Sequence, residues 1–102
     1  MIETTVTITR KGTGAIAQNV AAQLEQKNTM MAAYYNGAHP YDVFDCFLKY
    51  LLTPVLRGDV VTDQQHTDPL TNALTIYRVV GRPQAFPDGH QECVVDQFGG
   101  PS

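Results

Sequence analysis

The N-terminal segment alternates between apolar and polar residues. From Glu3 to Arg10, Val6 and Ile8 fall on one face of an extended chain, and Thr5, Thr7 and Thr9 fall on the other. Strict alternation of β-branched residues is typical of a β-strand with one buried face. The glycines in Lys11-Gly12-Thr13-Gly14 then favour a turn, because glycine adopts positive φ angles without strain. We therefore predict a strand over 3–10 followed by a turn.

The next segment, Ala15 to Lys27, fits two structures. Ile16, Val20 and Leu24 recur at every fourth position among alanines and glutamines, which favours an amphipathic helix. Val20, Ala22 and Leu24 also alternate with their neighbours as the residues of a strand would. Periodicity leaves both structures open, and the family resemblance described below favours a strand over Asn19 to Gln26.

The segment from Asn28 to Pro40 lacks a regular pattern and ends in a His-Pro pair, so we predict an irregular loop closed by a turn. It contains adjacent methionines and adjacent tyrosines, residue types that are enriched where proteins meet proteins. Packing of these side chains over the end of the fold is an equally good interpretation. The candidate protein-protein interface comprises Met30, Met31, Tyr34, Tyr35 and His39.

The rest of the chain predicts further strands separated by turn residues. The expected elements are a strand within Tyr41 to Leu52 closed by Pro54, a turn at 56–59 opening a strand at Val60-Val61, a polar connecting loop over Thr62 to Ala73, a strand over Leu74 to Arg82 broken by Pro83, a turn at 86–89, and a strand over His90 to Gln97. Short strands at regular spacing indicate an all-β fold, either a small antiparallel barrel or a sandwich. One short helix is compatible with this fold class. We expect a single domain over 1–98 and a flexible tail over 99–102.

Composition narrows the function classes. The chain has 102 residues, 43% of them hydrophobic, and a formal net charge of −3. Its seven basic residues are scattered, which argues against general or sequence-specific nucleic-acid binding, since phosphate neutralisation needs clustered Lys and Arg. The sequence has no apolar run long enough for a membrane helix and no signal-peptide pattern, so we expect a soluble intracellular protein without a membrane partner.

Candidate chemistry is sparse. His39, His66 and His90 are far apart in sequence, and Cys46 and Cys93 lack the short spacing of metal ligands. We interpret both cysteines as buried apolar residues. A disulfide between them requires that they lie on neighbouring strands and that the protein is in an oxidising compartment. The carboxylate pairs Asp42 with Asp45 and Asp59 with Asp63 fit turns better than acid-base catalysis. We expect no enzyme activity, no catalytic residues, no metal and no cofactor.

The tripeptide Arg57-Gly58-Asp59 spells a cell-adhesion motif. Because the sequence shows no secretion signal, a structural role is the stronger interpretation. Gly58 would supply the turn and Asp59 would accept hydrogen bonds from local backbone amides.

The order of these elements resembles a known family. The pattern comprises the turn at Arg57-Gly58-Asp59 before Val60-Val61, the run Tyr77-Arg78-Val79-Val80-Gly81 with Pro83, then Asp88-Gly89-His90, and in the N-terminal half Val6 to Thr9 and Asn19 to Glu25. It resembles the small head-closure or head-tail joining proteins of tailed bacteriophages. The short connection at 12–14 and the apolar 41–52 segment depart from that pattern. They leave three alternatives: a decorated variant of the family, a tail-terminator-like neighbour in the same assembly, or a different β-barrel.

The resemblance implies a structural adaptor of a phage or prophage virion. Such a protein assembles as a homo-oligomeric ring, binds the portal or connector on one side and tail proteins on the other, and is found in the host cytoplasm during assembly and then at the virion neck. The Asn28 to His39 loop would project into the channel or against a ring neighbour. The alternative function is a small β-barrel protein-binding module of a regulatory or immunity type, with no virion role, that recognises its partner through Met30 to Tyr35.

Overall fold

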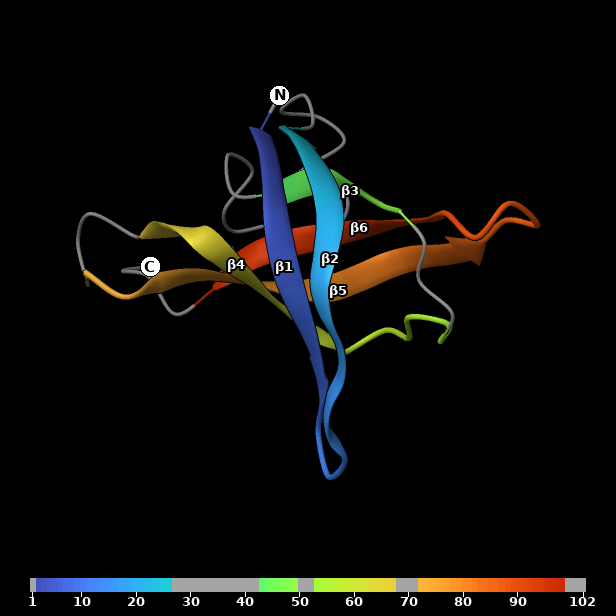
Figure 1. The fold of residues 1–102 in the computed structure, drawn as a ribbon, viewed down its shortest axis with the longest axis horizontal. Helices are drawn as coiled ribbons and strands as arrows, with labels where there is room; N and C mark the ends of the chain where they lie inside the picture. The colour runs from blue at the N-terminus through green and yellow to red at the C-terminus, as the bar shows by residue number, and fades with distance from the viewer. Residues whose placement is uncertain (1, 27–42, 50–52, 68–71, 99–102) are drawn as a thin grey trace.

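The computed structural model describes residues 2–26, 43–49, 53–67 and 72–98. The strands in these residues form a closed antiparallel barrel in the order β1-β2-β3-β6-β5-β4, and β4 pairs back onto β1 (Figure 1). The strands are β1 (Ile2–Arg10), β2 (Gly14–Gln26), β3 (Val43–Leu48), β4 (Val60–Thr67), β5 (Leu74–Ala85) and β6 (Gln91–Phe98). The predicted all-β antiparallel fold is confirmed, as a barrel, and no described residue lies in a helix.

The hydrophobic core fills the inside of the barrel. Along each strand, alternate side chains point inward, as Val6 and Ile8 do on β1, and both are fully buried. On β6, Cys93 and Val95 point inward in the same way. The buried members of this core are Val6, Ile8, Val20, Ala22, Leu24, Cys46, Leu48, Val55, Val61, Tyr77, Val79, Cys93 and Val95.

The ambiguous segment is a strand, which begins earlier than Asn19. β2 starts at Gly14 and pairs with β1 from Gly14 to Leu24. The register shifts twice, because β2 has an extra residue between the pairs Val6–Val20 and Ile8–Ala17 and another before Thr9–Ala15. Asn19 lies in the first irregularity with φ of 57°, a left-handed conformation that Asn tolerates better than most residues.

Two expected boundaries are wrong. The polar segment Thr62 to Ala73 was expected to be a loop, but its first part belongs to β4, which continues to Thr67. Its polar side chains are accommodated because Asp63, pointing inward, has hydrogen-bond partners inside the barrel. Pro83 does not break β5, which continues to Ala85, because Pro83 lies in a register shift between Gly81 and Gln84 where no ladder bond is lost.

Two hairpins extend beyond the closed part of the barrel (Figure 1). β2 pairs with β3 only from Ala22 onward, so among the described residues its first part pairs with β1 alone. The pairing of β5 with β4 stops at Arg78, and the rest of β5 pairs with β6 alone in the same described set. We term these hairpin parts the β1–β2 ribbon, residues 6–20, and the β5–β6 ribbon, residues 80–92. Each has one open edge, along β2 and along β5, whereas β1 still pairs with β4 up to Thr9 and β6 pairs with β3 from Gln91 onward.

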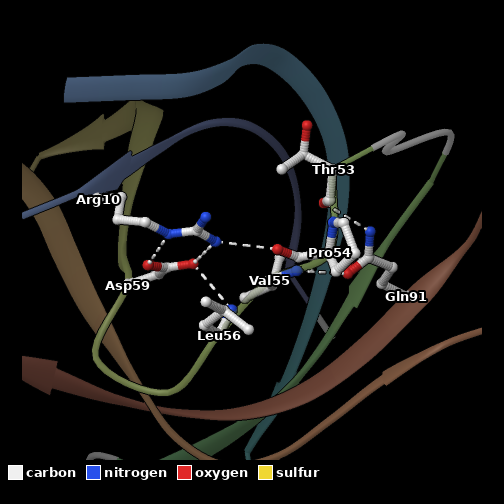
Figure 2. A network of polar contacts seen from close by, with 7 residues as sticks. All are labelled: Arg10, Thr53, Pro54, Val55, Leu56, Asp59 and Gln91. Carbon is white, nitrogen blue, oxygen red and sulfur yellow. Dashed lines mark hydrogen bonds and ion pairs between the residues drawn. The ribbon is translucent and has the colours of Figure 1, made fainter. Parts of the chain in front are cut away.

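The connection from β3 to β4 crosses one end of the barrel. This end segment, Thr53–Asp59, places Val55 in the core with 3% of its surface exposed. Gln91 on β6 fixes its first part, because the side-chain amide of Gln91 donates to Thr53 O at 2.9 Å and accepts from Val55 N at 2.8 Å. Figure 2 shows these contacts beside those of Arg10 and Asp59, which fix the other part.

Candidate functional site

The interface residues singled out from the sequence, Met30, Met31, Tyr34, Tyr35 and His39, lie outside the described residues. The strands that border them, β2 and β3, have their Gln26 and Val43 ends on the same side of the barrel as the start of β1. The prediction that these residues bind a protein stays a prediction.

A cleft of about 410 Å³ opens on the outside of the barrel, where β2, β3 and the turn between β5 and β6 meet. Gln23 and Phe47 face each other across β2 and β3, and Phe47 in turn faces Glu92 on β6. The described residues that line the cleft are Gln23, Phe47, Leu48, Lys49, Asp88 and His90. Its volume falls within the range of roughly 300–1,000 Å³ that is usual for small-ligand pockets. The lining combines an aromatic ring with an amide, an amine, a carboxylate and an imidazole.

His90 is held on both sides at the edge of this cleft. Its Nδ1 lies 2.7 Å from Asp88 Oδ1 and its Nε2 lies 2.9 Å from Glu92 Oε2. The ring also stacks on Phe86, with centroids 4.3 Å apart and an interplanar angle of 3°. The turn residue Asp88 therefore orients the imidazole as well as the backbone, since Asp88 Oδ1 also accepts from His90 N.

Asp88, His90 and Glu92 form a triad, and the two carboxylates favour the charged form of the imidazole. The hydrogen bond to Glu92, followed by the one to Asp88, raises the pKa of His90 above its ordinary value of 6.5. The side-chain hydrogen bond between Asp88 and His90, together with the bond from the backbone N–H of His90, lowers the pKa of Asp88. Both ring nitrogens of His90 are engaged, so neither is open to act as a general base or to bind a metal. The arrangement suits a rigid surface for recognition rather than proton transfer.

A second histidine pairs with a buried carboxylate inside the barrel. Asp63, 1% exposed, accepts a hydrogen bond from the Thr4 hydroxyl and from the backbone N–H groups of Gln65 and His66. Asp63 Oδ2 lies 2.9 Å from His66 Nδ1. Burial, together with the charges of Asp63 and Cys46, raises the pKa of Tyr77 to about 12. These contacts bind β4 to β1 and account for Asp63 structurally.

Of the carboxylate pairs named in the sequence, Asp59 and Asp63 do not share a site. Asp59 bonds to Arg10 and Asp63 bonds to Thr4 and His66, so each belongs to its own network. Asp42 lies outside the described residues, and its partner in the other pair, Asp45, lies on β3. Within residues 2–26, 43–49, 53–67 and 72–98, no cluster of His, Cys, Asp and Glu is arranged to hold a metal ion.

The adhesion tripeptide has a structural role. Gly58 adopts φ of 96°, which opens the turn as expected, and Leu56 N donates to Asp59 Oδ2 at 2.8 Å. The carboxylate is not displayed for a receptor, because Asp59 is 3% exposed. The predicted local backbone bond is confirmed. The long-range partner Arg10 was missed, since nothing in the sequence links residues so far apart in the chain.

Cys46 and Cys93 are both buried in the core, as expected, and they face each other across β3 and β6.

The described part of the chain contains no helix long and apolar enough to cross a membrane. Comparisons of the chain with protein-family models, with curated proteins and with solved structures found no match. The family resemblance therefore rests on the pattern of residues alone.

Proposed function

We propose that the protein is a ring-forming structural adaptor of a phage or prophage virion that joins the portal or head to the tail. The observation that carries this proposal is the pair of ribbons that extend beyond the closed barrel (Figure 1). Closing the barrel requires only the parts of the strands that have neighbours on both sides. The turns and the open edges of the ribbons are therefore available to contact other molecules.

The ribbons suit contacts through side chains better than pairing of strand edges. Pro83 has no N–H to donate from the open edge of β5, and the irregularity at Asn19 disturbs the edge of β2. Proline and bulges at an edge oppose the addition of another strand. The β5–β6 ribbon instead presents Phe86, 37% exposed, at its turn. An exposed aromatic side chain on a rigid projection is a typical anchor for a protein partner.

A ring needs contacts between unlike surfaces of identical copies. When such head-to-tail contacts close on themselves they give cyclic oligomers. The tip of the β1–β2 ribbon and the cleft beside the β5–β6 turn provide two unlike surfaces in the same molecule. The residue pattern from Arg57 to His90, which resembles the head-closure and head-tail joining proteins, supports placing this ring in a virion neck.

Mass photometry and negative-stain electron microscopy of the purified protein, alone and with a portal protein, test the proposal. We expect rings under at least one of these conditions. Phe86→Ala should weaken ring formation, whereas Leu74→Ala, a matched change at another exposed apolar residue, 42% exposed, should not. A protein that stays monomeric in both conditions contradicts the proposal. Rings that survive Phe86→Ala but not Leu74→Ala would move the contact away from the β5–β6 ribbon.

A second function, a protein-binding module with no virion role, is favoured by the cleft lined by Phe47, Lys49 and His90. This function requires no ring. Capture of one specific non-virion partner by a monomeric protein, lost in the variant Tyr34→Ala plus Tyr35→Ala, would support it. Genes for portal, capsid and tail proteins beside the coding gene would instead favour the virion adaptor.

A further inference from the structure

Cys46 and Cys93 form a cross-strand pair in the interior of the barrel. Cys46 on β3 lies directly opposite Cys93 on β6 in the antiparallel register. Both side chains belong to the same core cluster, with exposures of 0% and 4%. Opposite residues of antiparallel strands have Cα atoms about 4.5–5.5 Å apart, within the range of about 4.4–6.8 Å that disulfides span.

The two sulfur atoms are also within interaction distance of each other. The hydrogen bond between the two thiols, together with burial, raises the pKa of Cys46 well above its ordinary value. Two inward-pointing side chains at facing positions of paired strands meet the Cα spacing that a disulfide requires. In the structure both are free thiols.

We propose that Cys46 and Cys93 are a redox-modifiable pair that forms an intramolecular disulfide between β3 and β6. The inference does not depend on the virion role, because it concerns only the closure of the barrel.

The oxidant is a hydroperoxide or a small-molecule disulfide. With hydrogen peroxide, the first thiolate attacks one oxygen, the O–O bond breaks, and a sulfenic acid and hydroxide form; the hydroxide takes up the proton that the thiol released and becomes water. The second thiol then attacks the sulfenic sulfur, the S–S bond forms and a second water leaves. With a small disulfide, the first thiolate displaces one thiol to give a mixed disulfide, and the second displaces the other. Either route removes two electrons and two protons from the pair.

Burial controls the rate of this chemistry. The thiolate is the reactive form, and the contact between the thiols disfavours it inside the closed barrel. Oxidation of the folded protein therefore requires opening of the β3–β6 pairing, and reduction of the disulfide requires the same opening. A disulfide once formed would persist in the folded barrel after the oxidant is removed.

The disulfide would join two parts of the chain that are far apart in sequence. The chain between Cys46 and Cys93 contains all of β4 and β5. Cross-linking the ends of so long a segment restricts the unfolded chain, which favours the folded state. The oxidised protein should consequently unfold at a higher temperature than the reduced protein, by several degrees for a domain of this size.

The test exposes the full chain to hydrogen peroxide or oxidised glutathione under native conditions. We expect an intact mass lower by two hydrogens, a linked peptide pair containing Cys46 and Cys93 in a non-reducing digest, and a rise in melting temperature that a reductant reverses. Low urea should accelerate the oxidation, because it increases opening of the barrel.

Variants and alternative products make the outcome decisive. Cys46→Ala plus Cys93→Ala should melt at the same temperature with and without oxidant, and each single variant should lack the internal cross-link. Sulfinic acids or intermolecular dimers of the wild-type protein without the 46–93 link would overturn the proposal. A cross-linked protein that melts at a lower temperature than the reduced one would also overturn it. Neither result depends on whether the variants fold or on whether the protein forms rings.

Discussion

The guanidinium of Arg10 holds both carboxylate oxygens of Asp59, with Nε 3.0 Å from Oδ1 and Nη2 2.9 Å from Oδ2 (Figure 2). Arg10 ends β1, and Asp59 ends the segment that crosses the barrel. Arg10 Nη2 also donates to Pro54 O, so one side chain binds both parts of this crossing. Two-point contacts between arginine and a carboxylate are among the stronger and more specific side-chain hydrogen bonds in proteins.

Removing this carboxylate should destabilise the fold. Asp59→Ala removes the acceptor of the Leu56 amide and leaves Arg10 with Pro54 O alone among these acceptors, so we expect the free energy of unfolding to fall by about 1–3 kcal/mol. Arg57→Ala, a change at an exposed position of the same tripeptide, should alter it by less than about 0.5 kcal/mol. Urea unfolding followed by circular dichroism measures both. Equal losses in the two variants would show that the turn, rather than the ion pair, carries the effect.

The same pair should make stability depend on acidity. Burial acts to raise the pKa of Asp59, but the Arg10 hydrogen bond, the Leu56 amide and the Arg10 charge outweigh it, and the pKa lies below its ordinary value of 3.8. The folded state therefore binds the proton less readily than the unfolded state does. The stabilisation is present above the unfolded pKa and is lost as the pH falls through the folded value.

Asp59→Asn is the variant that isolates this effect. In urea titrations, the difference in stability between the wild type and Asp59→Asn should be largest near neutral pH and should shrink below about pH 4. Glu25→Gln serves as a comparison at an exposed carboxylate on β2. A difference between wild type and Asp59→Asn that stays constant down to about pH 2 would contradict the assigned role of the charge.

The sequence predicted the barrel better than it predicted the polar contacts. Alternation identified β1 directly, because Val6 and Ile8 face the core while Thr5, Thr7 and Thr9 alternate with them. It failed at β4, where Asp63 points inward. In the sequence, a buried aspartate looks like a loop residue, because nothing there shows its hydrogen-bond partner. The partner of Asp63 is Thr4, which lies on β1 and comes near only when the chain folds. The cleft around His90 was missed for the same reason, since β2, β3 and the β5–β6 turn meet only through tertiary pairing.

The bulge in β2 gives a prediction about one backbone conformation. Asn19 has φ of 57°, which a β-branched residue adopts only at a steric cost. Asn19→Val should lower the free energy of unfolding by about 1–2 kcal/mol, whereas Asn19→Gly should be tolerated. Gln18→Val, at the neighbouring exposed position, is the matched control and should have little effect. If Asn19→Val is as stable as Gln18→Val in urea, the left-handed conformation is absent in solution.

The triad at the cleft should be visible by NMR. The imidazole of His90 should titrate with a pKa above 6.5, because Glu92 and then Asp88 stabilise its protonated form. Glu92→Gln should lower this pKa more than Asp88→Asn does. Since the folded pKa is raised, the contribution of this triad to stability is complete below about pH 6.5 and is lost as the pH rises through the folded value. A His90 pKa at or below its ordinary value would exclude the triad.

The position of β6 has a consequence for how the chain reaches its native state. β6 lies between β3 and β5 and pairs with both, although it follows them in sequence. During synthesis on the ribosome, β3 and β5 emerge first and each has an unsatisfied row of backbone donors and acceptors until β6 is made. A nascent chain stalled before Gln91 would expose two adhesive strand edges at once, so we expect such truncated chains to aggregate or to recruit chaperones.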